Sequence, residues 1–165
     1  MYLDLLAYRG KLYCHTQQTF NMREFTSNLQ ALKQLAQSAA QRAYAPYSRF
    51  KVGAVLTLKN GETIVGCNVE NVSYGLSNCA ERTAIFSALA QGVQLADVTQ
   101  VTIFTPSDEV YSPCGACRQV MAEFLNADTP VISTSNGGEQ HWTVSELLPH
   151  AFHFNIDNYR ANEHE

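Results

Sequence analysis

The chain has 165 residues and a mass of 18.3 kDa, the size of one ordinary domain. With 45% hydrophobic and 16% charged residues, the composition excludes a disordered chain. The net charge is −4 with no visible basic stripe, which argues against a nucleic-acid partner. No apolar run approaches the roughly 20 residues that span a bilayer, and the first residues lack a secretory signal. We therefore expect a cytoplasmic protein without a membrane partner.

The first 22 residues differ from the rest of the sequence. Their apolar residues follow no clear period, and MREFTSNL from Met22 reads as an ordinary protein start. We interpret 1–22 as an N-terminal extension of unknown role, 23–155 as the folded domain and 156–165 as a C-terminal tail.

A helix followed by a hairpin is predicted at the start of the domain. Leucines and alanines recur at helical spacing, with Thr26 or Ser27 as the cap and Pro46 as the stop. Apolar residues then alternate over 50–58, and the Asn-Gly pair at 60–61 is typical of a type I′ turn into a second strand.

The remaining elements alternate between helices and strands. They are helices over 79–91 and 114–126, strands over 98–105, 130–134 and 140–144, and a short last helix capped by Ser145. This order implies one mixed sheet of about five strands with helices on its faces. We therefore predict an α/β fold, a three-layer α/β/α sandwich.

Two short motifs carry the chemistry, C-A-E at 79–81 and P-C-G-A-C at 113–117. Cys114 and Cys117 are three residues apart, so on a helix both sulfurs face one side, as two ligands of one tetrahedral metal must. Cys79 supplies a third thiolate and leaves the fourth position for water, which is the arrangement of a catalytic zinc site. Both motifs open predicted helices, whose N-termini favour thiolates. The sequence therefore predicts one Zn²⁺ per chain.

Glu81 is the predicted proton shuttle, because it lies two residues from Cys79 and can reach a water on the metal without being a ligand. A C-x-x-C pair alone would not distinguish a metal site from a redox dithiol or buried cysteines. Combined with C-x-E, it forms the three-cysteine variant of the zinc deaminase signature. Cys14 and Cys67 have no partner at ligand spacing, and we interpret them as incidental and as strand packing respectively.

With these motifs the sequence resembles the homotetrameric cytidine deaminases of pyrimidine salvage. The matching blocks are A-P-Y-S at 45–48 with Phe50 and V-G-A at 52–54, G-C-N-V-E-N at 66–71, C-A-E-R-T-A at 79–84, S-P-C-G-A-C-R-Q at 112–119, and E-L-L-P at 146–149 with Phe152. The resemblance implies the cytidine deaminase fold and hydrolysis of free cytidine and deoxycytidine to uridine and deoxyuridine, with release of ammonia. It also implies a homotetramer whose subunits share active sites around a small nucleoside.

The resemblance assigns a role to each matching residue. Glu81 is carried over as the catalytic residue that moves protons to N3 of the base and to the departing ammonia. The residues implied around the substrate are Phe50 on the pyrimidine, Asn68 and Glu70 on the sugar, and the backbones of Ala80 and Ser112 on the polar edge of the base. Asn68 and Glu70 lie two apart on a predicted strand, so both point to one face.

Four further residues are implied to complete the site. Arg82 and Gln119 offset the charge that three thiolates leave on the zinc. Tyr74 and Phe152 come from a neighbouring subunit. Val72 is larger than the residue expected after N-V-E-N, which leaves the substrate range near the 5′ end of the sugar open.

Three other functions are weighed against this one. A deaminase of the same fold acting on another substrate, such as a nucleoside antibiotic or a polynucleotide base, is disfavoured by the intact N-V-E-N and the acidic composition. A structural zinc module would need a fourth protein ligand and no Glu81. A C-x-x-C oxidoreductase would leave Cys79 and Glu81 unexplained.

Overall fold

The structure is a computed structural model that describes residues 11–13 and 19–154. At its centre is a five-stranded sheet in the order β4–β3–β5–β6–β7. The strands are β3 (Gly53–Leu58), β4 (Thr63–Cys67), β5 (Val98–Phe104), β6 (Pro130–Thr134) and β7 (Glu139–Thr143). Within this sheet β5 and β6 run parallel and the other neighbours antiparallel. A separate antiparallel pair, β1 (Lys11–Tyr13) and β2 (Thr19–Asn21), precedes the first helix.

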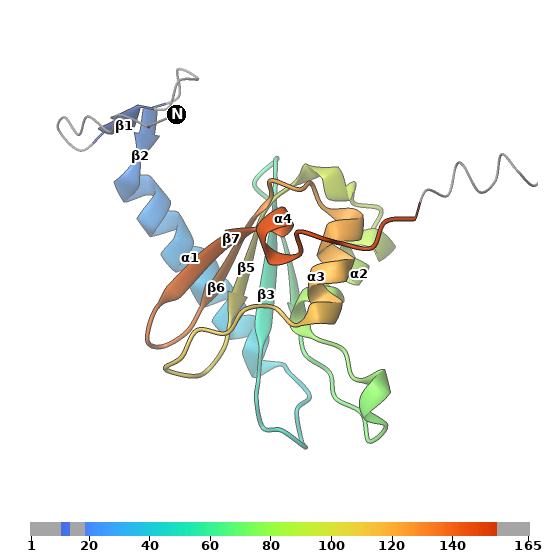
Figure 1. Ribbon diagram of the computed structural model, residues 1–165. Coiled ribbons are helices and arrows are strands. Elements are labelled where there is room, and N and C mark those ends of the chain that lie inside the picture. Colours follow the sequence, from blue (N-terminus) through green and yellow to red (C-terminus); the bar gives the residue numbers. More distant parts are fainter. Residues whose placement is uncertain (1–10, 14–18, 155–165) are drawn as a thin grey trace, which may run out of the picture.

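The helices form the two outer layers of the fold. They are α1 (Met22–Gln41), α2 (Ala80–Ala90), α3 (Gly115–Phe124) and α4 (Val144–Leu147), with 3₁₀ turns η1 (Tyr74–Leu76) and η2 (Leu95–Asp97). In Figure 1, α1 crosses one face of the sheet, while α2 and α3 cover the other. This arrangement confirms the predicted three-layer α/β/α sandwich with a mixed sheet.

Each face of the sheet has its own apolar core. On the α1 side, Leu32 and Ala36 pack with Val55 and Phe104. On the other side a larger cluster joins Leu56 and its neighbours to α2 and α3. Val55 and Leu56 are adjacent on β3 and both fully buried, since successive strand residues point to opposite faces. The central strands are therefore buried on both faces, as the layers require.

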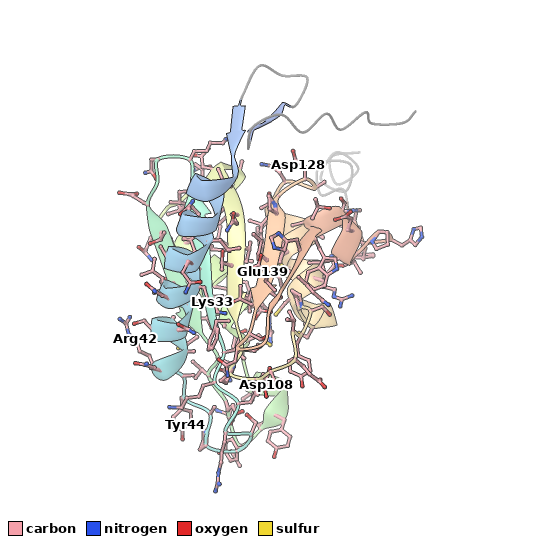
Figure 2. The ribbon with its side chains drawn as sticks, turned by 90° about the vertical axis from the view of Figure 1, so that its left-hand side faces the viewer. Lys33, Arg42, Tyr44, Asp108, Asp128 and Glu139 are labelled. Atoms are coloured by element: carbon pink, nitrogen blue, oxygen red, sulfur yellow. The ribbon has the colours of Figure 1, made fainter. Side chains whose placement is uncertain are left out.

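One side-chain hydrogen bond connects α1 to the backbone just after β6. Lys33, labelled on α1 in Figure 2, donates from Nζ to the carbonyl of Ser135 at 2.5 Å. Ser135 directly follows β6 and is buried. This bond joins the helix to the turn between β6 and β7.

Both predicted cap positions are wrong. The helix α1 begins at Met22, directly after β2 ends, so Thr26 and Ser27 fall inside it. The cap of α4 is Thr143 rather than Ser145, because Glu146 lies three residues after Thr143 and completes a capping box. The backbone N–H of Glu146 donates to Thr143 Oγ1 at 3.2 Å, and the N–H of Thr143 donates to the Glu146 carboxylate at 2.7 Å.

The hairpin between β3 and β4 is present, but its turn is not type I′. That turn needs positive φ at both central residues, and here only Gly61 has it, at 85°. Leu58 N–H donates to the Glu62 carbonyl and Gly61 N–H to the Leu58 carbonyl, which encloses a three-residue loop. Asn60 Oδ1 accepts from the N–H of Glu62 at 3.0 Å, so its side chain favours this longer turn.

Candidate metal centre and substrate cavity

The three cysteines of the two motifs meet where α2 and α3 begin. Cys79 is the N-cap of α2, Cys114 is the N-cap of α3, and Cys117 lies in the first turn of α3. Their Sγ atoms all lie within 4.8 Å of one another, and those of Cys79 and Cys114 are 3.8 Å apart. In Figure 1, α2 and α3 lie next to each other on one face of the sheet, and the loops before β3 and α2 form the lower end of the picture.

This set of sulfurs fits zinc. Thiolates about 2.3 Å from a tetrahedral zinc lie about 3.8 Å from one another, which matches the Cys79–Cys114 separation. Within the described residues, no fourth cysteine, histidine or carboxylate joins the group. Cys79, Cys114 and Cys117 would therefore hold the ion and leave one coordination position for water or substrate, as in catalytic zinc sites.

The pKa values of the Cys79 and Cys117 thiols are shifted in opposite directions. The pKa of the Cys79 thiol is lowered to about 5, first by its hydrogen bond with Cys117 and further by the Arg82 guanidinium. Arg82 Nη2 lies 3.6 Å from Cys79 Sγ and 3.3 Å from the carbonyl of Ser77. The pKa of Cys117 is raised by the same hydrogen bond and by burial. One thiolate is thus formed in advance, and a bound cation would displace the other protons.

Glu81 lies in the first turn of α2 and lines the same cavity as Cys79 and Cys114. Its side chain is buried, with 5% of the residue exposed, and burial raises the pKa of its carboxyl. The Cys79 thiolate raises this pKa further. A carboxyl whose pKa is raised toward neutrality can both take up and release a proton, as a general acid and base must.

The cavity beside the sulfurs has a volume of about 330 Å³. The rings of Phe50 and Tyr111 form part of its wall and meet edge to face, with centroids 5.9 Å apart and an interplanar angle of 77°. Ser112 and Pro113 continue the wall toward Cys114. Ala80, which follows Cys79 in the sequence, is fully buried and does not line the cavity. Such a wall suits a flat ring whose faces contact the aromatic side chains and whose edge carries hydrogen-bonding groups.

Asn68 and Glu70 also line the cavity, and both hold the loop before β3. They lie just after the end of β4 at Cys67, not within the strand as predicted. Asn68 Oδ1 accepts from the N–H of Val52, and its Nδ2 donates to the carbonyl of Phe50, both at 2.8 Å. The same residue therefore fixes the backbone on either side of Lys51, including that of Phe50.

The Glu70 carboxylate holds the preceding part of the same loop. It accepts the backbone N–H groups of Tyr47 at 2.9 Å and Ser48 at 3.2 Å, and also the hydroxyl of Ser48. The Ser48 hydroxyl is the main cause that lowers the pKa of Glu70. Ser48 Oγ in turn accepts the N–H of Phe50 at 3.0 Å. Ser48 therefore connects Glu70 to the backbone of Phe50, and both of these residues line the cavity.

The structure shows the surroundings of three further predicted residues, Gln119, Phe152 and Tyr74. The Gln119 side chain bonds the backbone of Phe152, donating to its carbonyl at 2.8 Å and accepting its N–H at 3.3 Å. Gln119 is two residues beyond Cys117 and so faces away from it on the helix. Phe152 is 71% exposed and does not line the cavity of its own chain. Tyr74 packs edge to face on Tyr47 of the same chain, with centroids 6.0 Å apart.

Sequence reasoning missed three residues of the site. Arg118 donates to the Pro113 carbonyl and Ser112 Oγ, both at 2.7 Å, and to the Leu147 carbonyl at 3.2 Å, so it fixes the loop that carries Cys114. Tyr111 and Ser48 line the cavity. All three lie in or beside the matching blocks, and that proximity was the only signal in the sequence.

None of the helices in the described part of the chain is long and apolar enough to traverse a lipid bilayer.

Comparison with known proteins gives one consistent family. Residues 26–133 match the family model described as the cytidine and deoxycytidylate deaminase zinc-binding region. The cytidine deaminase of Halalkalibacterium halodurans is 52% identical over 124 residues, which cover 74% of this chain and 92% of that protein. The probable cytidine deaminase of Dictyostelium discoideum is 45% identical over 117 residues, covering 71% and 78%.

Solved structures agree with this result. The crystal structure of cytidine deaminase from Burkholderia pseudomallei has a TM-score of 0.72 and 47% identity, and the match covers 74% of this chain and 98% of that one. The cytidine deaminase of Mycobacterium tuberculosis has a TM-score of 0.64 and 35% identity, covering 76% and 97%.

Proposed function

The chain belongs to the cytidine and deoxycytidylate deaminase family, and on this premise we propose that it hydrolyses free cytidine and deoxycytidine to uridine and deoxyuridine with release of ammonia. It is a deaminase with a zinc cofactor. The observation that carries the proposal is a cluster of three cysteine sulfurs, two of which line the same cavity as the buried residue Glu81. A place in pyrimidine salvage is part of the proposal.

The proposed mechanism assigns the proton transfers to Glu81. When bound by Cys79, Cys114 and Cys117, zinc supplies a nucleophile at neutral pH by lowering the pKa of water. Glu81 takes up the proton that water loses as its oxygen bonds to C4, and delivers this proton to N3 of the base. It then takes the remaining proton from the new hydroxyl at C4 and delivers it to the amino group, which leaves as ammonia while C4 becomes the carbonyl of the product. The raised pKa of Glu81 supports this role, because a carboxyl of ordinary pKa is almost wholly ionised at neutral pH and has little of the acid form to donate a proton.

The rest of the cavity supports a nucleoside as the substrate. Phe50 and Tyr111 offer an aromatic wall for the pyrimidine, and the backbone of Ser112 offers a partner for its polar edge. The backbone of Ala80 is proposed as a second partner, since Ala80 lies between Cys79 and Glu81, which both line the cavity. Asn68 and Glu70 offer partners for the sugar hydroxyls. Arg82 is proposed to offset the negative charge of the sulfurs, supported by its contact with Cys79.

Charge favours an unphosphorylated substrate. The charged residues that line the cavity, among those the structure describes, are the two carboxylates Glu70 and Glu81, and no lysine, arginine or histidine joins them. A phosphate at the sugar would meet the Glu70 carboxylate without a cation to pair with. We therefore propose that nucleotides are poor substrates.

The proposed assembly is a homotetramer with shared active sites. Phe152 supports it, because Gln119 fixes its backbone while its ring stays exposed and away from its own cavity. Exposed apolar side chains also cluster around η1, at Val72, Tyr74 and Leu76. Large exposed apolar groups of this kind mark interaction surfaces. In the proposal, Phe152 and Tyr74 serve the site of a neighbouring subunit.

Mixing two defective chains tests the shared site. Glu81→Ala and Phe152→Ala chains should each be poorly active, and co-expressed hybrids carrying both chains should exceed the sum of the two parents. The excess arises from sites that combine Glu81 of one chain with Phe152 of the other. Hybrids verified by two affinity tags whose activity never exceeds that sum would show that Phe152 does not act across subunits.

The proposed domain boundaries and compartment follow from the same premise. Residues 23–155 form the catalytic domain, with 1–22 as an extension and 156–165 as a tail, which the match over 26–133 supports. The cytoplasm is the proposed location, since cysteines that bind zinc must stay reduced.

Ammonia release tests the function directly. Protein with about one zinc per chain should release ammonia from cytidine and deoxycytidine and much more slowly from cytosine, deoxycytidylate or a cytosine-containing nucleoside antibiotic. No ammonia from either nucleoside would contradict the proposal. Faster release from the antibiotic would favour the other substrate considered for this fold.

A further inference from the structure

Gly66 on β4 touches the backbone of the first turn of α2. A Cβ atom built on Gly66 would lie 2.4 Å from the carbonyl oxygen of Ala80 and 2.4 Å from the backbone nitrogen of Ala84. Real Cβ atoms essentially never come closer than 3.0 Å to such neighbours, and backbone atoms cannot rotate away as side chains do. The backbones of α2 and β4 therefore approach each other more closely than any residue with a side chain would permit at position 66.

That turn of α2 carries two groups of the site. Cys79 caps it and Glu81 lies within it, whereas Cys114 and Cys117 belong to α3. The separation between Cys79 and the two sulfurs of α3 therefore depends on where α2 rests. Relieving the contact at Gly66 requires a shift of several tenths of an ångström, which is large for a tetrahedral site whose bond lengths are defined to about 0.2 Å.

We propose that Gly66 is a positioning residue of the zinc site, whose missing side chain sets the distance of Cys79 and Glu81 from the sulfurs of α3. The inference rests on the proposed zinc ligands but concerns a residue that touches neither metal nor substrate. It predicts that an added methyl group changes the geometry of the metal, beyond any loss of stability.

Gly53 provides a matched control on the other face of the sheet. It pairs with Cys67 on β4, and the next pair along the same ladder is Ala54 with Gly66. A Cβ on Gly53 would lie 1.9 Å from the carbonyl oxygen of Ala36 in α1, a tighter contact than any at Gly66. The described part of α1 contributes no residue to the cavity, so Gly53→Ala should disturb packing without moving the metal ligands.

The experiment compares the whole protein with its Gly66→Ala and Gly53→Ala variants after loading with Co²⁺ or Zn²⁺. The visible spectrum of bound Co²⁺ reports ligand geometry, chelator competition gives the zinc affinity, and thermal unfolding gives stability. For Gly66→Ala we expect an altered Co²⁺ spectrum and zinc affinity weaker by about 10- to 100-fold, the range for residues that orient metal ligands. Gly53→Ala should lower the melting temperature but keep the wild-type spectrum.

Two results would overturn the proposal: a wild-type spectrum and zinc affinity in Gly66→Ala, or an equal change of both in Gly53→Ala. Should Gly66→Ala not fold, Ala84→Val enlarges the buried side chain of a residue whose backbone meets Gly66. Its control is Ala36→Val in α1, a buried residue whose backbone meets Gly53, and the same criteria apply. Failure of the wild-type protein to give a tetrahedral thiolate spectrum would instead contradict the zinc ligands of the proposed function.

Discussion

The two ends of the cavity are built in different ways. At the metal end, Cys79, Cys114 and Cys117 lie on the first turns of packed helices, and Glu81 is buried beside them. The sugar end is the proposed sugar site at Asn68 and Glu70, where Glu70 accepts hydrogen bonds from the loop before β3 that solvent can reach. Helix packing fixes the groups at the metal end, whereas in the proposed function the hydroxyls of the substrate can replace hydrogen-bond partners of Glu70. We therefore expect abrupt losses from changes at the metal end and graded losses at the sugar end.

The largest effect is expected from Cys114→Ala. With two sulfurs left, the site should lose zinc and with it all measurable ammonia release from cytidine. Metal analysis and the activity assay check this result. Cys67→Ala is the control, because Cys67 is a free cysteine outside the sulfur cluster and should keep both zinc and activity. Full zinc occupancy in Cys114→Ala would remove Cys114 from the ligand set.

Glu81→Gln should separate metal binding from catalysis. The amide fills the same space but cannot transfer protons, so zinc content should stay near one per chain while kcat falls by about 10²- to 10⁴-fold or more. Glu123→Gln, at an exposed position on α3, should behave as the wild type. A tenfold or smaller loss in Glu81→Gln would contradict its role as the proton shuttle.

At the sugar end, Ser48→Ala should give a moderate, pH-dependent effect. KM for cytidine should rise about 5- to 30-fold at neutral pH with kcat little changed, because the hydroxyl loses its hydrogen bonds to Glu70 and to the N–H of Phe50, each worth about 1 kcal/mol. Ser48→Thr keeps the hydroxyl and should retain most of the affinity. A fall in kcat as large as that of Glu81→Gln would show that the two ends are not distinct.

The pH profile sharpens the same test. The Ser48 hydroxyl is the main cause that lowers the pKa of Glu70 below 4.5, so the carboxylate stays ionised when the pH falls through that value. Without the hydroxyl this pKa rises, and Glu70 takes up its proton at higher pH. The ratio of kcat/KM between Ser48→Ala and the wild type should therefore decrease as the pH is lowered toward 4.5. A constant ratio would exclude ionised Glu70 from substrate binding.

The smallest effect is expected from deleting residues 1–21, so that Met22 starts the chain. The segment has no periodic apolar face, and the family match begins at residue 26. Turnover and melting temperature should change little. Inactive or insoluble truncated protein would show that the extension is structural.

The same contrast explains what the sequence could predict. The metal end depends on short spacings, such as the three residues between Cys114 and Cys117 on one helix, and these follow from local geometry. The element order likewise yielded the layers and the hairpin. The contact between Ser48 and Glu70 joins residues 22 positions apart, and its existence depends on how two loops pack. Neither spacing nor propensity encodes such a contact.

The wrong cap of α4 and the unassigned role of Arg118 have separate physical reasons. Thr143 and Ser145 are both good caps, and the choice between them depends on which one has Glu146 at the right distance. The role of Arg118 cannot be predicted from the sequence, because its three acceptors include the carbonyl of Leu147, which the fold brings to α3 from α4. A long-range acceptor on the backbone leaves no signature in the residue types.

The meeting of Cys79 and Cys114 on two different helices also ties folding to metal supply. A bound ion would join α2 to α3 across 35 positions of the chain, and the unfolded chain lacks this preformed site. By mass action, each tenfold rise in free zinc above the dissociation constant adds about 1.4 kcal/mol to the free energy of unfolding. The melting temperature of this protein is therefore a function of the free zinc concentration, and chelating buffers will lower it without altering a single residue.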